Sequence, residues 1–421
     1  MRPAIVVGAG PSGLAAATAL ARRGVEPLVL EAAGRIGGRL VTDELDGFLI
    51  DRGFQVVNTS YPALPRYAPL ELLGLRPLPS AASVLWEGHW VNFGSRFRAP
   101  GLIPATLGAP FARPGDLIRL GLALGRLLPS NKAALGYPEP DTSALAWLRA
   151  IGLSESIIEA FFRPFFGGVL LDLELASSAR CLRYDLRQFV VGRAALPARG
   201  IRAVPELMAE RLGHRRVRLS APVADLLRGN GGECAGVRLA GGEEIRSRLV
   251  IVATEAPAAA RLTDLPLPTA GNGEVCVHVA VDRPLLPGGR LLLDPRSDSV
   301  FANIVEPSAS APTYAPAGSA LLMLVAPGPP EVDRDWETTA LEAIHDHFPA
   351  LPPAATRVLR VDLIPFGVLA QPPGIHPSLD RWRQPAPGLF LAGEEALASS
   401  LNAALISGER AARDAVAFLG R

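Results

Sequence analysis

The sequence predicts an α/β protein, and three stretches of it carry that prediction. The N-terminal stretch places two apolar runs around a glycine-rich turn. Residues 216–254 contain short strand-like runs that are separated by Asn-Gly-Gly and Gly-Gly turns. Residues 387–419 begin as an apolar strand pattern and continue as an alanine-rich helix pattern. Strand and helix patterns that alternate in this way are typical of a parallel sheet covered by helices, to which hairpins are added.

The first apolar run, residues 3–7, is followed by the turn Gly8-Ala-Gly-Pro-Ser-Gly13 and by a helix expected at residues 12–23. A GxGxxG turn between a strand and a helix predicts a dinucleotide-binding site. Gly8 permits the tight turn, Gly10 lets a pyrophosphate approach the backbone, and Gly13 lets the helix pack closely on the strand. Free N–H groups at the start of the helix then favour the phosphates.

The second apolar run, residues 25–30, ends at Glu31. A carboxylate at this place accepts hydrogen bonds from ribose hydroxyls and repels a 2′-phosphate, so the pattern disfavours NADP. The chain continues as Arg35-Ile-Gly-Gly-Arg39, in which adjacent glycines allow a second loop to approach a diphosphate and the arginines supply positive charge. The GxGxxG turn by itself fits both NAD and FAD.

The stretch from Glu31 to Arg39 resembles the flavin-binding N-terminus of the amine oxidase, phytoene desaturase and protoporphyrinogen oxidase superfamily. Residues 387–419 are similar to the closing flavin motif of that superfamily, with Glu394 where aspartate is usual and Ala403 where glycine is frequent. The resemblance implies that FAD is the cofactor. It also implies a Rossmann-type FAD-binding domain interleaved with an α+β substrate domain, in the amine oxidase or p-hydroxybenzoate hydroxylase-like topology.

The same resemblance implies how the chain is divided and which residues bind FAD. The FAD-binding domain is expected at residues 1–75, 190–265 and 356–421, and the substrate domain at 76–189, which is patterned as helices, and 266–355. The residues assigned to FAD are Gly8, Gly10, Pro11, Ser12, Gly13, Glu31, Ala32, Arg35, Gly37, Gly38, Arg39, Phe54, Val223, Gly393, Glu394, Leu401, Asn402 and Ala403. No cysteine follows Cys276, so a cysteinyl link near the closing motif is impossible, and FAD is expected to bind non-covalently.

Two features disfavour a typical amine oxidase. The resemblance implies a lysine beside the flavin, from the second half of the substrate domain, but the only lysine in the chain is Lys132. It also implies an aromatic residue in the closing motif that would help to cage an amine, and residues 397–404 contain none.

A phenylalanine-rich stretch at residues 161–166, together with Phe54 and Phe366, predicts an apolar substrate cavity. Such a cavity suits a hydrophobic small molecule such as an isoprenoid, a polyene or a porphyrin-like ring.

Four residues are candidates for the catalytic site: Gln55, Arg163, Phe166 and His278. Arg163 is expected either to hold a substrate carboxylate or to pair with a structural acid such as Asp172. His278 alternates with valines on a strand pattern, which allows its side chain to face the cavity or the core of the sheet.

Three interpretations of the function follow. The first is an FAD-dependent oxidoreductase that transfers hydride from a hydrophobic organic substrate to flavin N5, as an oxidase, dehydrogenase, desaturase or isomerase, with O2 or a quinone as the electron acceptor. The second is an amine or amino acid oxidase with an atypical pocket. The third is a flavin-binding protein without catalysis.

Composition bears on the other classes of function. The net charge is +1, which offers no electrostatic basis for binding nucleic acid. The 3 cysteines and 6 histidines lack metal-site spacing, so no metal is expected. The scattered cysteines and the lack of a run of about 18 apolar residues favour a cytoplasmic protein without a transmembrane helix. Residues 117–128 are apolar with two arginines, which leaves peripheral membrane contact as an alternative.

Overall fold

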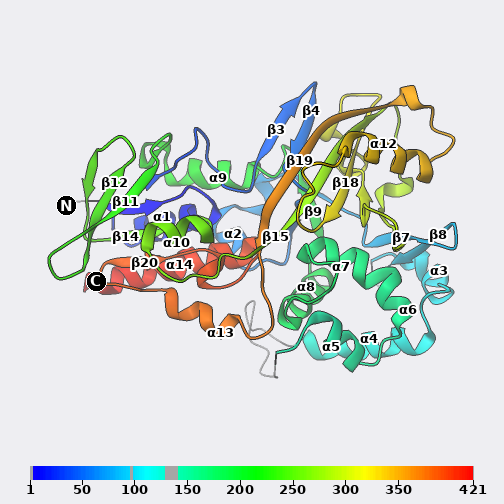
Figure 1. Ribbon diagram of the computed structural model, residues 1–421, viewed down its shortest axis with the longest axis horizontal. Coiled ribbons are helices and arrows are strands. Elements are labelled where there is room, and N and C mark those ends of the chain that lie inside the picture. Colours follow the sequence, from blue (N-terminus) through cyan, green and yellow to red (C-terminus); the bar gives the residue numbers. More distant parts are fainter. Residues whose placement is uncertain (1–2, 95–97, 129–140, 421) are drawn as a thin grey trace.

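The structure is a computed structural model that describes residues 3–94, 98–128 and 141–420. Its first part is a parallel sheet of five strands in the order β10-β2-β1-β14-β20 (Figure 1). The strands are β1 Ala4–Val7, β2 Pro27–Leu30, β10 Val217–Arg218, β14 Val250–Val252 and β20 Leu389–Leu391. This is the order of a doubly wound sheet, in which ligands bind beyond the carboxyl ends of the strands.

Both faces of the parallel sheet are covered, which explains why its strands are continuous apolar runs. On one face, Val6 packs in a core with the helices α1 Pro11–Ala21, α9 Ala203–Leu212 and α14 Leu401–Phe418. On the other face, Ile5 and Val7 pack against a three-stranded antiparallel sheet and the helix α10. These elements are β11 Val223–Arg228, β12 Cys234–Leu239, β13 Glu244–Arg246 and α10 Ala256–Thr263. The two glycine turns predicted within residues 216–254 are confirmed as the connections between these antiparallel strands.

The second part is a mixed sheet of seven strands in the order β19-β15-β18-β17-β16-β7-β8. The strands are β7 Ala81–Trp86, β8 His89–Gly94, β15 Gly271–Val281, β16 Leu291–Leu293, β17 Asn303–Val305, β18 Ala320–Pro327 and β19 Thr356–Leu369. The long strands β15 and β19 run side by side through the middle of the molecule (Figure 1). The helix α12 Trp336–His347 packs on one face of this sheet with Val275, Val277 and Val279 of β15.

Two expectations about this part need correction. Residues 76–189 were patterned as helices, and helices occur there, but β7 and β8 form a hairpin that joins the seven-stranded sheet. Its two-residue turn has positive φ at both Glu87 and Gly88, the type I′ signature, so the hairpin signal was present in the sequence. Residues 356–369 were expected in the FAD-binding domain, but β19 pairs with β15 in the seven-stranded sheet. A strand belongs to the sheet of its partner, and the partner here lies far away in the chain.

The remaining described elements are short sheets and helices. One hairpin pairs β3 Thr42–Leu45 with β4 Phe48–Asp51, and a further small sheet contains β5 Val57–Asn58, β9 Ala194–Pro197 and β6 Leu75–Pro77. A group of helices lies beside the seven-stranded sheet (Figure 1): α3 Ile103–Leu107, α4 Pro114–Leu127, α5 Ala144–Ala150, α6 Glu155–Ile157, α7 Arg163–Leu170 and α8 Ala179–Val191. The other short helices are α2 Leu64–Tyr67, α11 Pro307–Ser310 and α13 His376–Leu379. Within the described ranges, no helix combines the length and the apolar character that crossing a bilayer requires.

Candidate functional site

A cavity of about 1870 Å³ connects the two parts of the molecule. At one end it is lined by Gly8 and Glu31, which follow the carboxyl ends of β1 and β2. At the other end it is lined by aromatic residues of α7 and its neighbours, including Phe161 and Phe165. The cavity therefore starts where a doubly wound sheet binds its ligands and reaches the predicted apolar pocket.

The glycine-rich turn forms a narrow cradle at the first end. Gly8 has φ +104°, a conformation that favours glycine. Gly10 faces Gly38 of the following loop, and a Cβ on Gly38 would lie 3.3 Å from the Gly10 Cα. A Cβ on Gly13 would overlap the carbonyl oxygen of Gly8, so Gly13 allows α1 to pack close to the turn. Gly13 itself does not line the cavity, although it was assigned to the cofactor.

The polar groups of this end fit a dinucleotide. The Ser12 hydroxyl oxygen is buried on the cavity wall and has no hydrogen-bond partner among the described residues. Glu31 accepts hydrogen bonds from the backbone N–H groups of Ala9, at 2.7 Å, and Ala33, at 2.9 Å, and these bonds hold its carboxylate at the cavity. Phosphate oxygens can take the Ser12 hydroxyl and the N–H groups of the helix start, and the ribose lies within reach of a carboxylate held in this way.

Most of the other residues assigned to FAD also line the cavity. These are Gly8, Gly10, Pro11, Ser12, Glu31, Ala32, Arg35, Gly38, Arg39, Phe54, Val223, Gly393, Glu394 and Leu401.

Three further residues assigned to FAD do not line the cavity. Gly37 has φ +116° and packs on the carbonyl of Leu40. Asn402 is fully buried and accepts a hydrogen bond from the backbone of Ala63, at 3.1 Å. Ala403 is fully buried within α14. Because α14 begins at Leu401, the next two residues turn toward the core, and the cavity is lined instead by Ser399, Ser400, Leu401 and Ala404.

The closing segment presents Glu394 to the cavity. Its Oε1 lies 2.6 Å from Nη2 of Arg39, and its Oε2 accepts hydrogen bonds from the backbone of Leu369, at 2.9 Å, and from the hydroxyl of Ser399. The neighbouring Glu395 does not line the cavity. Both of its oxygens are buried without a partner in the described part of the chain, and burial raises its pKa to about 8.

The apolar end is built from the predicted phenylalanines. Phe161, Phe165 and Phe166 line the cavity, and the rings of Phe161 and Phe165 stack with their centroids 5.3 Å apart. Phe162 packs in the helical core instead. Phe366 also lines the cavity, with the guanidinium of Arg39 5.7 Å from its ring centroid.

The four catalytic candidates have different surroundings. Phe166 and Gln55 line the cavity, but the amide of Gln55 donates to the backbone carbonyls of Arg39 and Arg52, both at 2.8 Å, and so holds the loop. Arg163 does not line the cavity and does not pair with Asp172. Its guanidinium pairs with Glu159, one helical turn earlier, at 2.5 Å.

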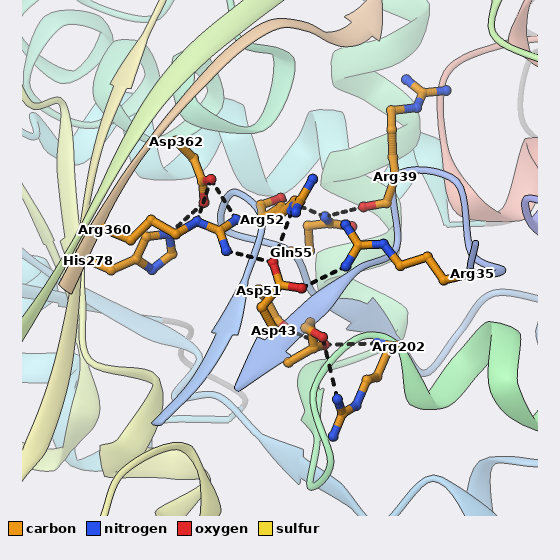
Figure 2. Close-up of polar contacts among 11 residues, drawn as sticks. Arg35, Arg39, Asp43, Asp51, Arg52, Gln55, Arg202, His278, Arg360 and Asp362 are labelled. Atoms are coloured by element: carbon orange, nitrogen blue, oxygen red, sulfur yellow. Dashed lines mark hydrogen bonds and ion pairs between the residues drawn. The ribbon is translucent and has the colours of Figure 1, made fainter. Parts of the chain in front are cut away.

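His278 does not line the cavity either, although its strand position was consistent with that. The imidazole is fully buried, and its Nε2 lies 3.0 Å from Oδ2 of Asp362 (Figure 2). Asp362 does line the cavity, so His278 contacts the site only through this carboxylate.

Sequence reasoning missed two carboxyl groups of the site, Glu274 on β15 and Asp362 on β19. Both line the cavity. The alternation along residues 274–278 would have placed Glu274 on the same face as His278 and was the available signal. Asp362 had no such signal, because its neighbours across the sheet are set by strand pairing.

A polar network extends from Asp362 to Arg35, in the loop that follows β2 (Figure 2). Arg360 donates to Oδ1 of Asp362, at 2.7 Å, and to Oδ2 of Asp43, at 2.6 Å. Asp43 also accepts hydrogen bonds from Arg35, at 2.6 Å, and Arg52, at 3.1 Å. Burial alone would raise the pKa of Asp43, but the three guanidinium groups hold it well below its usual range.

Comparison with known proteins agrees with this geometry. The family model described as flavin-containing amine oxidoreductase matches residues 11–416. The chain is 33% identical over 178 residues to coproporphyrinogen III oxidase of Propionibacterium freudenreichii subsp. freudenreichii. This alignment covers 39% of this chain and 31% of the relative. The chain is 26% identical over 247 residues to 15-cis-phytoene desaturase of Arabidopsis thaliana, which covers 54% of this chain and 40% of the relative.

These alignments span less than half the length of either relative. Among solved structures, cyclohexylamine oxidase from Brevibacterium oxydans IH-35A superposes over 100% of both chains, with a TM-score of 0.70 and 22% identity. At that identity the likeness concerns the fold, and it agrees with the α/β class predicted from the sequence.

Proposed function

Because the chain belongs to the flavin-containing amine oxidoreductase family, we propose that it is an FAD-dependent oxidoreductase whose small organic substrate has a large apolar part. One observation carries the proposal. A single cavity runs from the glycine-rich turn to a group of stacked phenylalanines. An organic molecule at the apolar end can therefore reach a dinucleotide that is held at the other end.

The chain offers a place for each part of FAD. Gly10, Gly38 and Ser12 would hold the diphosphate, Glu31 the ribose and the backbone at Val223 the adenine. When bound, the flavin accepts the electron pair that the substrate loses, and O2 or a quinone would regenerate it.

Non-covalent binding is supported by the cysteines. Cys181, Cys234 and Cys276 are buried, and none lines the cavity in the described part of the chain.

The substrate class is supported by the composition of the cavity wall. The described residues contain no lysine, and Lys132 lies outside them. A hydrophobic substrate also agrees with the names of the two relatives, a coproporphyrinogen III oxidase and a phytoene desaturase. The alternative substrate is an amine, which the carboxyl groups of Glu274 and Asp362 on the cavity wall would accommodate.

The test is anaerobic mixing of the purified, flavin-loaded protein with coproporphyrinogen III, phytoene and cyclohexylamine. Bleaching of the flavin absorbance by the first or second compound would support the proposal, and bleaching by cyclohexylamine alone would support the alternative. A flavin that none of these reduces, but that dithionite reduces fully, would favour a binding protein without catalysis.

The proposal includes peripheral membrane contact by a cytoplasmic protein. Leu117, Leu120 and Leu124 of α4 line the cavity, while Ile118 and Leu122 of the same helix are 64% and 62% exposed. An apolar helix face at a cavity wall would let a lipid-like substrate enter from a bilayer. Co-sedimentation with phosphatidylglycerol vesicles that is lost in the Ile118→Ser, Leu122→Ser double variant would support this contact, and no sedimentation of the wild type would exclude it.

A further inference from the structure

Strand pairing brings two carboxyl groups together on the cavity face of the seven-stranded sheet. Cys276 of β15 lies directly opposite Asp362 of β19, and Glu274 lies directly opposite Ile364. Residues two apart on a strand share a face, as do direct cross-strand partners. Glu274 and Asp362 are therefore diagonal neighbours on one face, while Val275 points to α12 on the other.

The Glu274 carboxyl group faces the cavity without a partner. Glu274 is 7% exposed and lines the cavity. It makes no hydrogen bond or ion pair with any described residue, although a buried carboxyl normally has one. Its Oε1 occupies the space that a side chain at Gly53 would fill, since a Cβ there would overlap it. The carboxyl is thus aimed into the cavity and left available to a ligand.

The carboxyl group of Asp362, in contrast to that of Glu274, has partners. Its two oxygens contact His278 and Arg360. Burial alone would raise its pKa, but these two partners lower it. Burial, and then the charge of Asp362, raises the pKa of Glu274 to about 8. Neighbouring carboxyl groups are suited to acid–base chemistry when their surroundings shift their pKa values in opposite directions, as happens here.

Two other carboxyl groups of the cavity have partners, and a third does not. Glu31 is hydrogen-bonded to backbone N–H groups, and Glu394 is paired with Arg39. Asp185 of α8 also lines the cavity without a hydrogen bond or ion pair to a described residue, and burial raises its pKa to about 7. No neighbouring carboxylate contributes to the raised pKa of Asp185. Asp185 therefore serves as the matched comparison for Glu274.

We propose that Glu274 is a catalytic acid–base residue of this cavity and that Asp362, held by His278 and Arg360, is the positioning residue that acts on it. The inference rests on the proposed function. A two-electron dehydrogenation removes two hydrogens from the substrate. One would leave with the electron pair to a bound flavin, which would accept both electrons, and the other would leave as a proton to the ionised Glu274 carboxylate, which would become a carboxylic acid.

The first test compares Glu274→Gln with Asp185→Asn in the flavin-loaded protein. The probe is whichever of coproporphyrinogen III, phytoene and cyclohexylamine bleaches the wild-type flavin. General acid–base catalysis contributes about 10²–10⁴-fold, so Glu274→Gln should slow bleaching by about 100-fold or more with little change in the probe concentration for half-maximal rate. The wild-type rate should rise toward about pH 8, and that rise should be absent from the variant.

The second test uses Asp362→Asn, which keeps the Glu274 carboxyl. The charged group that acts on Glu274 is Asp362, which itself contacts Arg360 on β19 and His278 on β15, and Arg52 beside Gly53 also lines the cavity. Removing the negative charge of Asp362 should move the rising part of the pH profile to lower pH. A residue with only a structural role would lower the rate without moving the profile.

A third measurement does not need turnover. The infrared band of a protonated carboxyl should persist at about pH 7 in the flavin-loaded wild type and in Asp185→Asn, and should lose intensity in Glu274→Gln. Retained flavin content and circular dichroism would show that each variant is folded.

The outcomes separate the two proposals. A wild-type flavin that none of the probes reduces overturns the proposed function, and the acid–base role with it. A reducible wild type with an unchanged rate and pH profile in Glu274→Gln overturns only the acid–base role. If the rise in rate toward about pH 8 is lost in Asp185→Asn and kept in Glu274→Gln, the acid–base role belongs to Asp185 and the role of Glu274 is overturned.

Discussion

Arg39 and Glu394 form an ion pair in which Nη2 of the arginine lies 2.6 Å from Oε1 of the glutamate. The pair joins the loop after β2 to the segment after β20, which are 355 residues apart in the chain. Glu394 is 5% exposed, so its charge would be costly if it were left alone. Arg39 therefore holds together the two walls between which the cofactor is proposed to bind.

Arg39→Ala is expected to lower the free energy of unfolding by about 2 kcal/mol or more, because it leaves a buried carboxylate without its counter-charge. Urea unfolding measures this effect. The control is Arg66→Ala, which breaks an exposed ion pair with Glu409 and should cost less than about 1 kcal/mol. Equal losses in the two variants would show that the Arg39 pair has no special role.

Gly10→Ala should weaken FAD binding, whereas Gly13→Ala should lower the stability of the protein. The nearest atom to a Cβ on Gly10 is the Gly38 Cα, at 3.9 Å, so the flavin-free variant should unfold at nearly the wild-type temperature. The added methyl group would occupy the proposed diphosphate position, and FAD affinity should fall at least tenfold. A Cβ on Gly13 overlaps the Gly8 carbonyl, so that variant should lose stability even without FAD. Thermal melts and FAD titrations of both variants check this, and a stable, flavin-loaded Gly13→Ala would contradict the packing role.

Gly53→Ala should disturb Glu274 specifically. Gly53 has φ +78°, so alanine costs about 1 kcal/mol of backbone strain, and the new Cβ must also displace the Glu274 carboxyl. Gly88→Ala is the matched control, because its φ is +81° and no atom lies within 4 Å of the added Cβ. Both variants should lose stability, but only Gly53→Ala should change the pH profile of flavin reduction. Identical profiles would show that the contact with Gly53 does not orient the carboxyl.

Glu395→Gln should stabilise the protein at high pH. The folded-state pKa of Glu395 is about 8, against an ordinary value of 4.5. As the pH rises through this window, the unfolded chain loses the proton while the folded chain keeps it, so the wild type loses stability. Glutamine removes that loss. The melting temperature of the variant should exceed that of the wild type at about pH 8 and match it at about pH 4, whereas a gain that is the same at both would contradict the linkage.

The local elements of the dinucleotide end could be predicted because their signals are short-range. The strand, the turn from Gly8 to Gly13 and the helix follow one another in the chain. Gly13 is required by the Gly8 carbonyl a few residues away, whereas the atoms that restrict Gly8 belong to the distant Ala253. Positions near the same site were harder to predict. Asn402 and Ala403 were assigned to FAD by motif position, but both are fully buried in the helix that begins at Leu401 and do not line the cavity.

The carboxyl groups on the sheet wall of the cavity could not be predicted in the same way. His278 and Asp362 are 84 residues apart, and they meet only because β19 pairs with β15 in one particular register. A shift by one residue would turn Asp362 to the opposite face of the sheet. The sequence by itself therefore determined the first strand, the glycine-rich turn and the helix after it through contacts between chain neighbours, and it indicated the family of the cofactor through its motifs. The order of the parallel sheet depends on pairing between distant strands. Only the tertiary structure decided which carboxyl groups face the cavity and which are ionised, because pairing between distant strands and burial set both.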